Sequence, residues 1–162
     1  ITACPTLHYV AEEFDVSAQK KPSGQVLHSW HTKLEPGEDG PLIQRAIKQA
    51  GYRYSVTENI ETRKESLASI LKLYPRSEFV VTTRLHGAII AYAFQRPYIA
   101  ISYDPKILAF QELYGGGVCI KDASELSTVI EEGKFRTLGN YQRELERVRE
   151  FGEQARARLM VK

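Results

Sequence analysis

The sequence predicts a doubly wound α/β domain built on a parallel sheet of about five strands. Short β-branched and aromatic runs alternate with longer stretches whose apolar residues recur at helical spacing. The clearest unit begins at Phe79–Thr82, which fits a strand buried on both faces. A helix of small apolar residues follows at Ala88–Phe94 and ends before Pro97, and a second apolar strand comes at Tyr98–Ser102. This order forms a βαβ unit, in which the two strands are parallel.

Two strands and two helices are predicted upstream of this unit. Gly51 stands where a helix C-terminal cap belongs, and a proline follows the second helix. In chain order, the elements are a strand at Gln25–Trp30, a helix at Leu42–Ala50, a strand at Tyr52–Val56 and a helix at Ser66–Tyr74.

The alternation continues downstream and completes the sheet. A short helix is predicted at Ile107–Leu113, and a short strand at Val118–Ile120. In the next helix, Asp122–Ile130, Asp122 and Glu125 have the spacing of a capping box. We expect the strand order 3-2-1-4-5, the default of doubly wound domains.

The C-terminal tail predicts a long charged helix. We expect it to dock along this domain or along a preceding one, and a coiled-coil dimer is the alternative. Apolar or small residues recur every three or four positions at Tyr141, Leu145, Val148, Gly152, Ala155 and Leu159.

Composition indicates an ordinary α/β domain. Of the 162 residues, 43% are hydrophobic and 26% charged, enough for one core, and the formal charge of +2 is too small to indicate nucleic acid or an anionic membrane as a partner. No apolar run reaches the roughly 18 residues of a membrane span. Cys4 and Cys119 are too few for a disulfide framework and lack metal-ligand spacing, which favours reduced thiols in the cytoplasm. His8, His28 and His31 are assigned surface or core roles.

Candidate binding residues follow the two strands of the βαβ unit. Arg84 and His86 stand between the first strand and its helix, where helix N–H groups and a partial positive charge attract anions. Gly87 would let a ligand approach the first helical turn. If the strands are neighbours, their exits lie side by side, and Lys106 faces the same crevice. The alternative is structural: Arg84 caps a neighbouring helix, and His86 is a hydrogen-bonded imidazole without a ligand.

A longer motif surrounds these residues. The segment TTRLHGAIIAYAFQRPYIAISYDPK, residues 82–106, resembles the signature region of the polysaccharide pyruvyl transferase family, with its R-x-H-G turn, small-residue helix, I-A-I-S-Y strand and following D-x-K. The opening Thr2–Thr6 resembles the C-P-T segment of that family. The resemblance covers Ile1–Gly133 and implies the C-terminal half of an enzyme with two Rossmann-like domains, similar to GT-B glycosyltransferases.

On this resemblance the chain divides into three parts. Residues 1–24 are expected to be the end of an N-terminal domain and a linker, the linker being Asp15–Gly24. Residues 25–135 would be the Rossmann-like donor-binding domain, and residues 136–162 the charged helix. A further N-terminal domain that contacts the acceptor is expected, and the chain alone need not be active.

The resemblance also implies a reaction. Phosphoenolpyruvate would donate a pyruvyl group, as a ketal, to a saccharide acceptor, lipid-linked or polymeric, of a cell-surface polysaccharide. Arg84 would bind a carboxylate or phosphate, with Lys106 as a second cation, and His86 would act as general acid or base. Ser102 and Tyr103 would orient the donor. No cofactor or metal is expected. The location would be cytoplasmic, with peripheral membrane association through a lipid-linked substrate as an option, and a homo-oligomer is left open.

Two alternatives stay open. A GT-B glycosyltransferase would use the same crevice for a nucleotide-sugar diphosphate, with Glu112 or Glu125 as candidate contacts to the nucleoside. A non-catalytic Rossmann-like module would retain the pocket without using it.

Overall fold

The computed structural model describes most of the chain. For residues 5, 8, 159 and 160 it describes the backbone alone. The described residues are 5–14, 22–31, 33, 35, 37–63, 65–102, 104–136 and 141–160.

A parallel sheet forms the centre of the fold, and its order is β2-β1-β3-β4-β5. The predicted order 3-2-1-4-5 is therefore wrong, because the chain passes back across β1 after β2 and places β3 on the other side of β1. The order reverses between β1 and β3, which makes their carboxyl ends the switch point of the sheet. The strands are β1 (Gln25–Ser29), β2 (Arg53–Thr57), β3 (Phe79–Thr82), β4 (Tyr98–Ile101) and β5 (Val118–Ile120).

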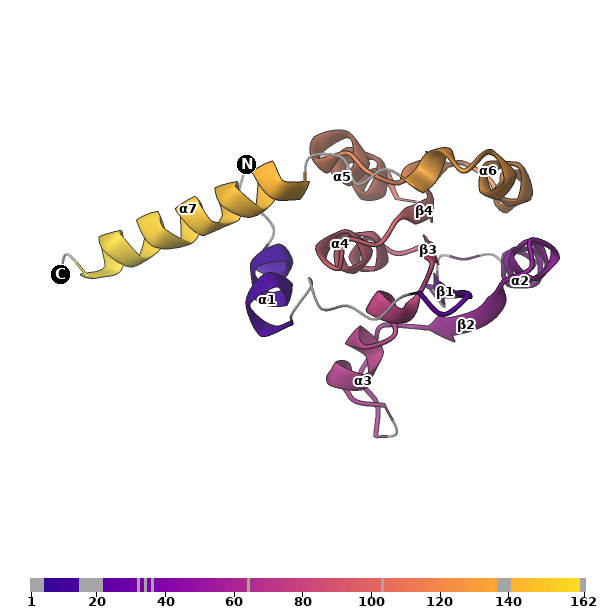
Figure 1. The fold of residues 1–162 in the computed structure, drawn as a ribbon, viewed down its shortest axis with the longest axis horizontal. Helices are drawn as coiled ribbons and strands as arrows, with labels where there is room; N and C mark the ends of the chain where they lie inside the picture. The colour runs from indigo at the N-terminus through magenta and orange to yellow at the C-terminus, as the bar shows by residue number, and fades with distance from the viewer. Residues whose placement is uncertain are drawn as a thin grey trace.

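Helices cover both faces of the sheet, as the prediction of a doubly wound fold requires. Figure 1 shows α2 and α6 on one side of the strands and α1, α4 and α5 on the other. The α-helices are α1 (Pro5–Glu13), α2 (Asp39–Gln49), α3 (Leu67–Leu71), α4 (Leu85–Ala93), α5 (Pro105–Tyr114), α6 (Leu126–Glu132) and α7 (Tyr141–Met160). Short 3₁₀ turns lie at Tyr74–Arg76, Ala123–Glu125 and Lys134–Arg136.

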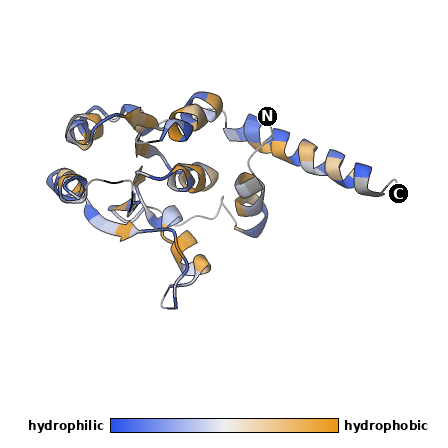
Figure 2. Cartoon of the chain, turned by 180° about the vertical axis from the view of Figure 1, so that it is seen from behind, coloured by the Kyte–Doolittle hydropathy of each residue, from blue (hydrophilic) through white to orange (hydrophobic). Residues whose placement is uncertain are grey.

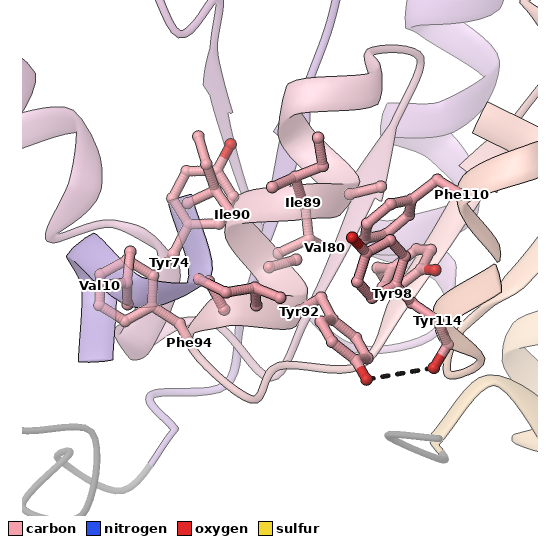
Figure 3. Packing of buried hydrophobic residues seen from close by; sticks show 14 of the residues in the cluster. Val10, Tyr74, Val80, Ile89, Ile90, Tyr92, Phe94, Tyr98, Phe110 and Tyr114 are labelled. Carbon is pink, nitrogen blue, oxygen red and sulfur yellow. Dashed lines mark hydrogen bonds between the residues drawn. The ribbon is translucent and has the colours of Figure 1, made fainter. Parts of the chain in front are cut away.

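Each face of the sheet has its own hydrophobic core, because successive strand residues point to opposite sides. Leu27 and Val80 pack with α4, whereas Val26 and Val81 pack with α2 and α6. In the larger core, aromatic side chains gather around α4, and the buried hydroxyl of Tyr92 donates a hydrogen bond of 3.1 Å to a carbonyl at the end of α5 (Figure 3). The nearly all-apolar α4 is buried along its length, as its sequence predicts.

Some helix boundaries differ from the predicted ones. The helix predicted at Ser66–Tyr74 ends at Leu71, and a 3₁₀ turn follows from Tyr74. Pro75 has no N–H to donate to the carbonyl of Leu71, four residues earlier, so the α-helix does not continue through the turn. The capping box at Asp122 and Glu125 is confirmed.

The N-terminal segment contains a helix that the sequence analysis placed among the linker and domain-end residues. Leu7 and Val10 of α1 are fully buried and belong to the core around α4. The helix also contacts α7. Residues 15–21 of the predicted linker lie outside the described residues. The division at residue 24 stays a prediction, but α1 shares a core with the sheet domain.

The first half of α7 docks on this domain. Tyr141, Leu145 and Val148 are buried in the core that α1 and α4 share. The second half extends away from the other elements (Figure 1), and hydrophilic residues are frequent along it (Figure 2). Within the described residues, no helix has both the length and the apolar character needed to cross a membrane.

Candidate functional site

A pocket of about 330 Å³ opens at the carboxyl ends of the inner strands. β3 pairs directly with β4, so the two strand exits lie side by side as predicted. The lining of the pocket comes from the loop after β1, from the β3–α4 junction and from the start of α5. The residues are His31, Thr83, Arg84, Leu85, His86, Asp104 and Lys106. The structure therefore brings together the three predicted cationic or titratable residues.

Arg84 lies at the N-cap of α4, and its backbone N–H is hydrogen-bonded to the last residue of β3. Its N–H donates to the Thr82 hydroxyl over 3.0 Å, and that hydroxyl also lies 3.0 Å from the carbonyl of Ser29. The guanidinium Nη1 donates to the carbonyl of Glu58 over 2.5 Å. Arg84 thus binds a loop carbonyl and does not cap a neighbouring helix. Its Nε is buried and finds no hydrogen-bond partner among the described residues. Most buried polar atoms in folded proteins are hydrogen-bonded, so an unpaired donor of this kind is uncommon.

His86 occupies the first turn of α4 and is exposed. Its ring makes no hydrogen bond with any other described residue, so it is free to meet a ligand. Around it, the first N–H groups of α4 have no partner in their own helix and carry the positive end of the helix dipole.

Lys106 enters from the start of α5. Its backbone N–H is capped by the Asp104 carboxylate at 2.9 Å, while its exposed side chain has no ion-pair partner in the described parts of the chain. Ser102 does not line this pocket. It lies in an adjacent one of about 490 Å³, together with Cys119, whose thiol has its pKa raised by burial. Tyr103 lies outside the described residues.

Gly87 faces the sheet. A Cβ at this position would lie 2.1 Å from Thr82 Oγ1 and 2.6 Å from Ser29 Oγ, so the missing side chain lets α4 pack onto β1 and β3. This packing is a structural reason for glycine, and a contact between Gly87 and a ligand stays a prediction.

Sequence reasoning missed a polar network beside the pocket. His28 is 1% exposed and its Nε2–H donates to Glu35 Oε2 at 3.0 Å. The Thr83 hydroxyl donates to the same oxygen at 2.9 Å, and the Tyr54 hydroxyl lies 2.9 Å from His28 Nδ1. Burial and the nearby Glu35 charge raise the pKa of Tyr54 to about 12. The available signal was the position of His28 and His31 at the exit of an inner strand.

The two Glu residues proposed as nucleoside contacts do not line this pocket. Glu125 Oε1 accepts the backbone N–H groups of Lys121 and Asp122 at 3.0 and 2.9 Å, so its carboxylate is engaged in the capping box. Glu112 is exposed on α5. Within the described residues, no group of three or more His, Cys, Asp or Glu residues is arranged to hold a metal ion.

Comparison with known proteins gives one match. The sequence model of a family described as polysaccharide pyruvyl transferase matches residues 2–105, from the C-P-T segment to the start of α5. The match includes Arg84, His86 and Gly87 and ends one residue before Lys106. No curated protein matches the chain. No solved structure matches it either.

Proposed function

The chain belongs to the polysaccharide pyruvyl transferase family, and we propose that the pocket around Arg84 and His86 binds phosphoenolpyruvate as the donor of a pyruvyl group. The acceptor is a saccharide of a cell-surface polysaccharide or its lipid-linked precursor, and the reaction takes place in the cytoplasm. The observation that carries the donor assignment is the lining of one pocket by Arg84, His86 and Lys106, and the buried Nε of Arg84, which has no partner among the described residues, is consistent with it.

The charges of the pocket suit a small molecule with several negative groups. Phosphoenolpyruvate carries a carboxylate and a phosphate. Arg84 can bind either group through two parallel hydrogen bonds, and Lys106 adds a point charge. The N-terminus of α4 offers backbone N–H groups to the same anion.

The chemistry requires one proton donor and charge stabilisation. Protonation of C3 makes C2 electrophilic, and a sugar hydroxyl then attacks C2 and loses its proton. Departure of phosphate lets a second hydroxyl add to C2 and lose its proton to the released phosphate, which yields the ketal and inorganic phosphate. We assign one of these proton transfers to His86, and the assignment is supported by its exposed ring at the pocket, which is not hydrogen-bonded to any described residue. Arg84 stabilises the departing phosphate.

The test is a titration of the chain with phosphoenolpyruvate, followed by calorimetry or by NMR. We expect saturable binding that Arg84→Ala weakens at least about tenfold, since hydrogen bonds to a charged group contribute about 1.5–3 kcal/mol. Arg45→Ala, which removes an exposed arginine of α2, is the matched control and should bind normally. Binding of UDP without phosphoenolpyruvate would refute the proposal and favour a glycosyltransferase.

His86→Ala separates catalysis from binding. In a preparation that transfers pyruvyl groups, this variant should retain donor binding and lose turnover by about 100-fold or more, the usual contribution of a positioned acid or base. Unchanged turnover would exclude His86 as the proton-transfer residue and leave it as a pocket wall.

A further inference from the structure

A buried carboxylate in the loop after β1 is hydrogen-bonded to the sheet. The side chain of Glu35 is 2% exposed, and one of its oxygens accepts hydrogen bonds from His28 on β1 and from Thr83 after β3. The two donors come from neighbouring strands at the switch point. Glu35 therefore ties the loop to both strands whose ends form the pocket.

The backbone of Glu35 fixes His31 in turn. The Glu35 N–H donates to the His31 carbonyl over 2.9 Å. The Lys33 N–H donates to His31 Nδ1 over 3.1 Å. An Nδ1 that accepts a hydrogen bond cannot carry the ring proton, so the neutral ring holds its proton on Nε2. His31 thus presents a hydrogen-bond donor at the wall of the pocket.

Charge alone does not explain the presence of Glu35. Burial of a carboxylate is costly even when it is paired, and replacement of such a pair by apolar groups is often neutral or stabilising. A negative charge beside an anion pocket also opposes anion binding. Any gain in binding from Glu35 must therefore come from the geometry that it imposes on the loop.

We propose that His31 is a further anion-binding residue of the pocket, and that His28 and Glu35 are positioning residues that hold it as an Nε2–H donor. The proposal rests on the proposed function, in which the anion is phosphoenolpyruvate. The effect of removing Glu35 on anion affinity distinguishes this positioning role from a purely electrostatic role, because the two roles predict changes of opposite sign. Through-space charge predicts that loss of Glu35 tightens anion binding, whereas loss of positioning predicts that binding weakens.

The experiment measures the affinity for phosphoenolpyruvate in a set of variants. His31→Ala should weaken binding about tenfold, the loss of one hydrogen bond to a charged group. Glu35→Ala should weaken it severalfold, and Glu35→Ala combined with His31→Ala should bind no more weakly than His31→Ala alone. Glu35→Gln should bind nearly as the parent, because its amide oxygen can accept both hydrogen bonds. Glu38→Ala removes an exposed carboxylate that makes no capping bond, and it should not weaken binding.

A readout without ligand follows the His31 ring directly. The ¹⁵N shifts of His31 should report the Nε2–H tautomer in the parent and in Glu35→Gln, and a mixture of tautomers in Glu35→Ala. Thermal unfolding of each variant identifies any that fail to fold, and Glu35→Gln keeps the test valid in that case. Unaltered affinity in His31→Ala, additive losses in the double variant, or tighter binding in Glu35→Ala would each overturn the proposal.

A parallel titration with inorganic phosphate separates the two proposals. If phosphate binds through His31 and phosphoenolpyruvate does not bind, the donor assignment fails and the His31 assignment stands. If phosphoenolpyruvate binds to the parent and to His31→Ala alike, only the His31 assignment fails. If neither anion binds to the parent, both assignments are wrong.

Discussion

Substitution of Gly87 by alanine should destabilise the domain, because no space exists for the added methyl group. The new Cβ would lie 2.1 Å from Thr82 Oγ1, 2.6 Å from Ser29 Oγ and 2.9 Å from Ser29 Cβ. Thr82 and Ser29 are both fully buried, and the Thr82 hydroxyl also accepts the N–H of Arg84. Neither side chain can move away without loss of hydrogen bonds at the carboxyl ends of β1 and β3.

The magnitude follows from three contributions. Overpacking of a close-packed core costs about 1–3 kcal/mol, and contacts this short place Gly87 at the upper end. Displacement of Thr82 costs about 1 kcal/mol for a broken hydrogen bond. The better helix propensity of alanine returns up to about 1 kcal/mol. The net loss is about 3 kcal/mol, or roughly 6–12 °C in Tm for a domain of this size.

Urea unfolding followed by circular dichroism measures this loss, provided the m-value is unchanged. Gly152→Ala is the matched control, because a Cβ at this helical glycine of α7 has no neighbour within 4 Å, and we expect it to stabilise the protein slightly. The double variant Gly87→Ala/Thr82→Ala should lose less than the sum of the single losses, since it removes the shortest contact. Equal stabilities of Gly87→Ala and the parent would refute the reasoning.

Two further predictions concern tyrosines. Tyr141→Phe should lower the free energy of unfolding in urea by about 1–2 kcal/mol, because the Tyr141 hydroxyl donates over 3.1 Å to the Ala93 carbonyl. The residue four positions after Ala93 is Pro97, which has no N–H to take the place of the hydroxyl. Unchanged stability would contradict this role. Burial raises the pKa of Tyr54 and Tyr74 to about 12 from about 10 in the unfolded chain, so the stabilising contribution of these two phenols is fully present below pH 10, and the free energy of unfolding should fall between pH 10 and 12, less steeply in Tyr74→Phe. A flat profile over this range would show that these phenols ionise without hindrance.

The βαβ unit was predictable because its signals are local. A short run of β-branched and aromatic residues fits a strand buried on both faces, and Pro97 ends the following helix wherever the rest of the chain lies. Consecutive strands with a right-handed helical connection usually pair, which placed Arg84 near Lys106.

The strand order was not predictable from hydrophobic pattern, because β1 buries the same residues whichever neighbour pairs with each of its edges. A polar turn follows β2. Asn59 adopts the left-handed region at φ 54°, which asparagine tolerates better than most residues. Its side-chain amide donates to Ser29 Oγ over 2.8 Å and accepts from the Tyr74 hydroxyl over 2.8 Å. This polar contact holds the segment that leads to β3 beside the end of β1.

Helix α1 has a signal in the sequence that predicts it. Leu7, Val10, Ala11 and Phe14 have helical spacing, and all four pack on the larger core. The adjoining polar segment favoured a linker interpretation instead. His31 belongs to no periodic pattern, and the hydrogen bond between His28 and Glu35 in the same region forms only in the folded chain.

The position of β1 in the sheet also bears on how the protein forms. β1 pairs with β2 across 28 residues (25 to 53) and with β3 across 53 residues (26 to 79). Non-local parallel pairing of this kind slows folding, and an apolar strand with open edges is prone to aggregate. During synthesis, β1 leaves the ribosome before the other strands of this sheet. Its edge that pairs with β3 stays unpaired until Phe79–Thr82 has emerged. We therefore expect the chain to depend on chaperones during that interval. We also expect that no nascent chain that ends before β3 acquires anion affinity.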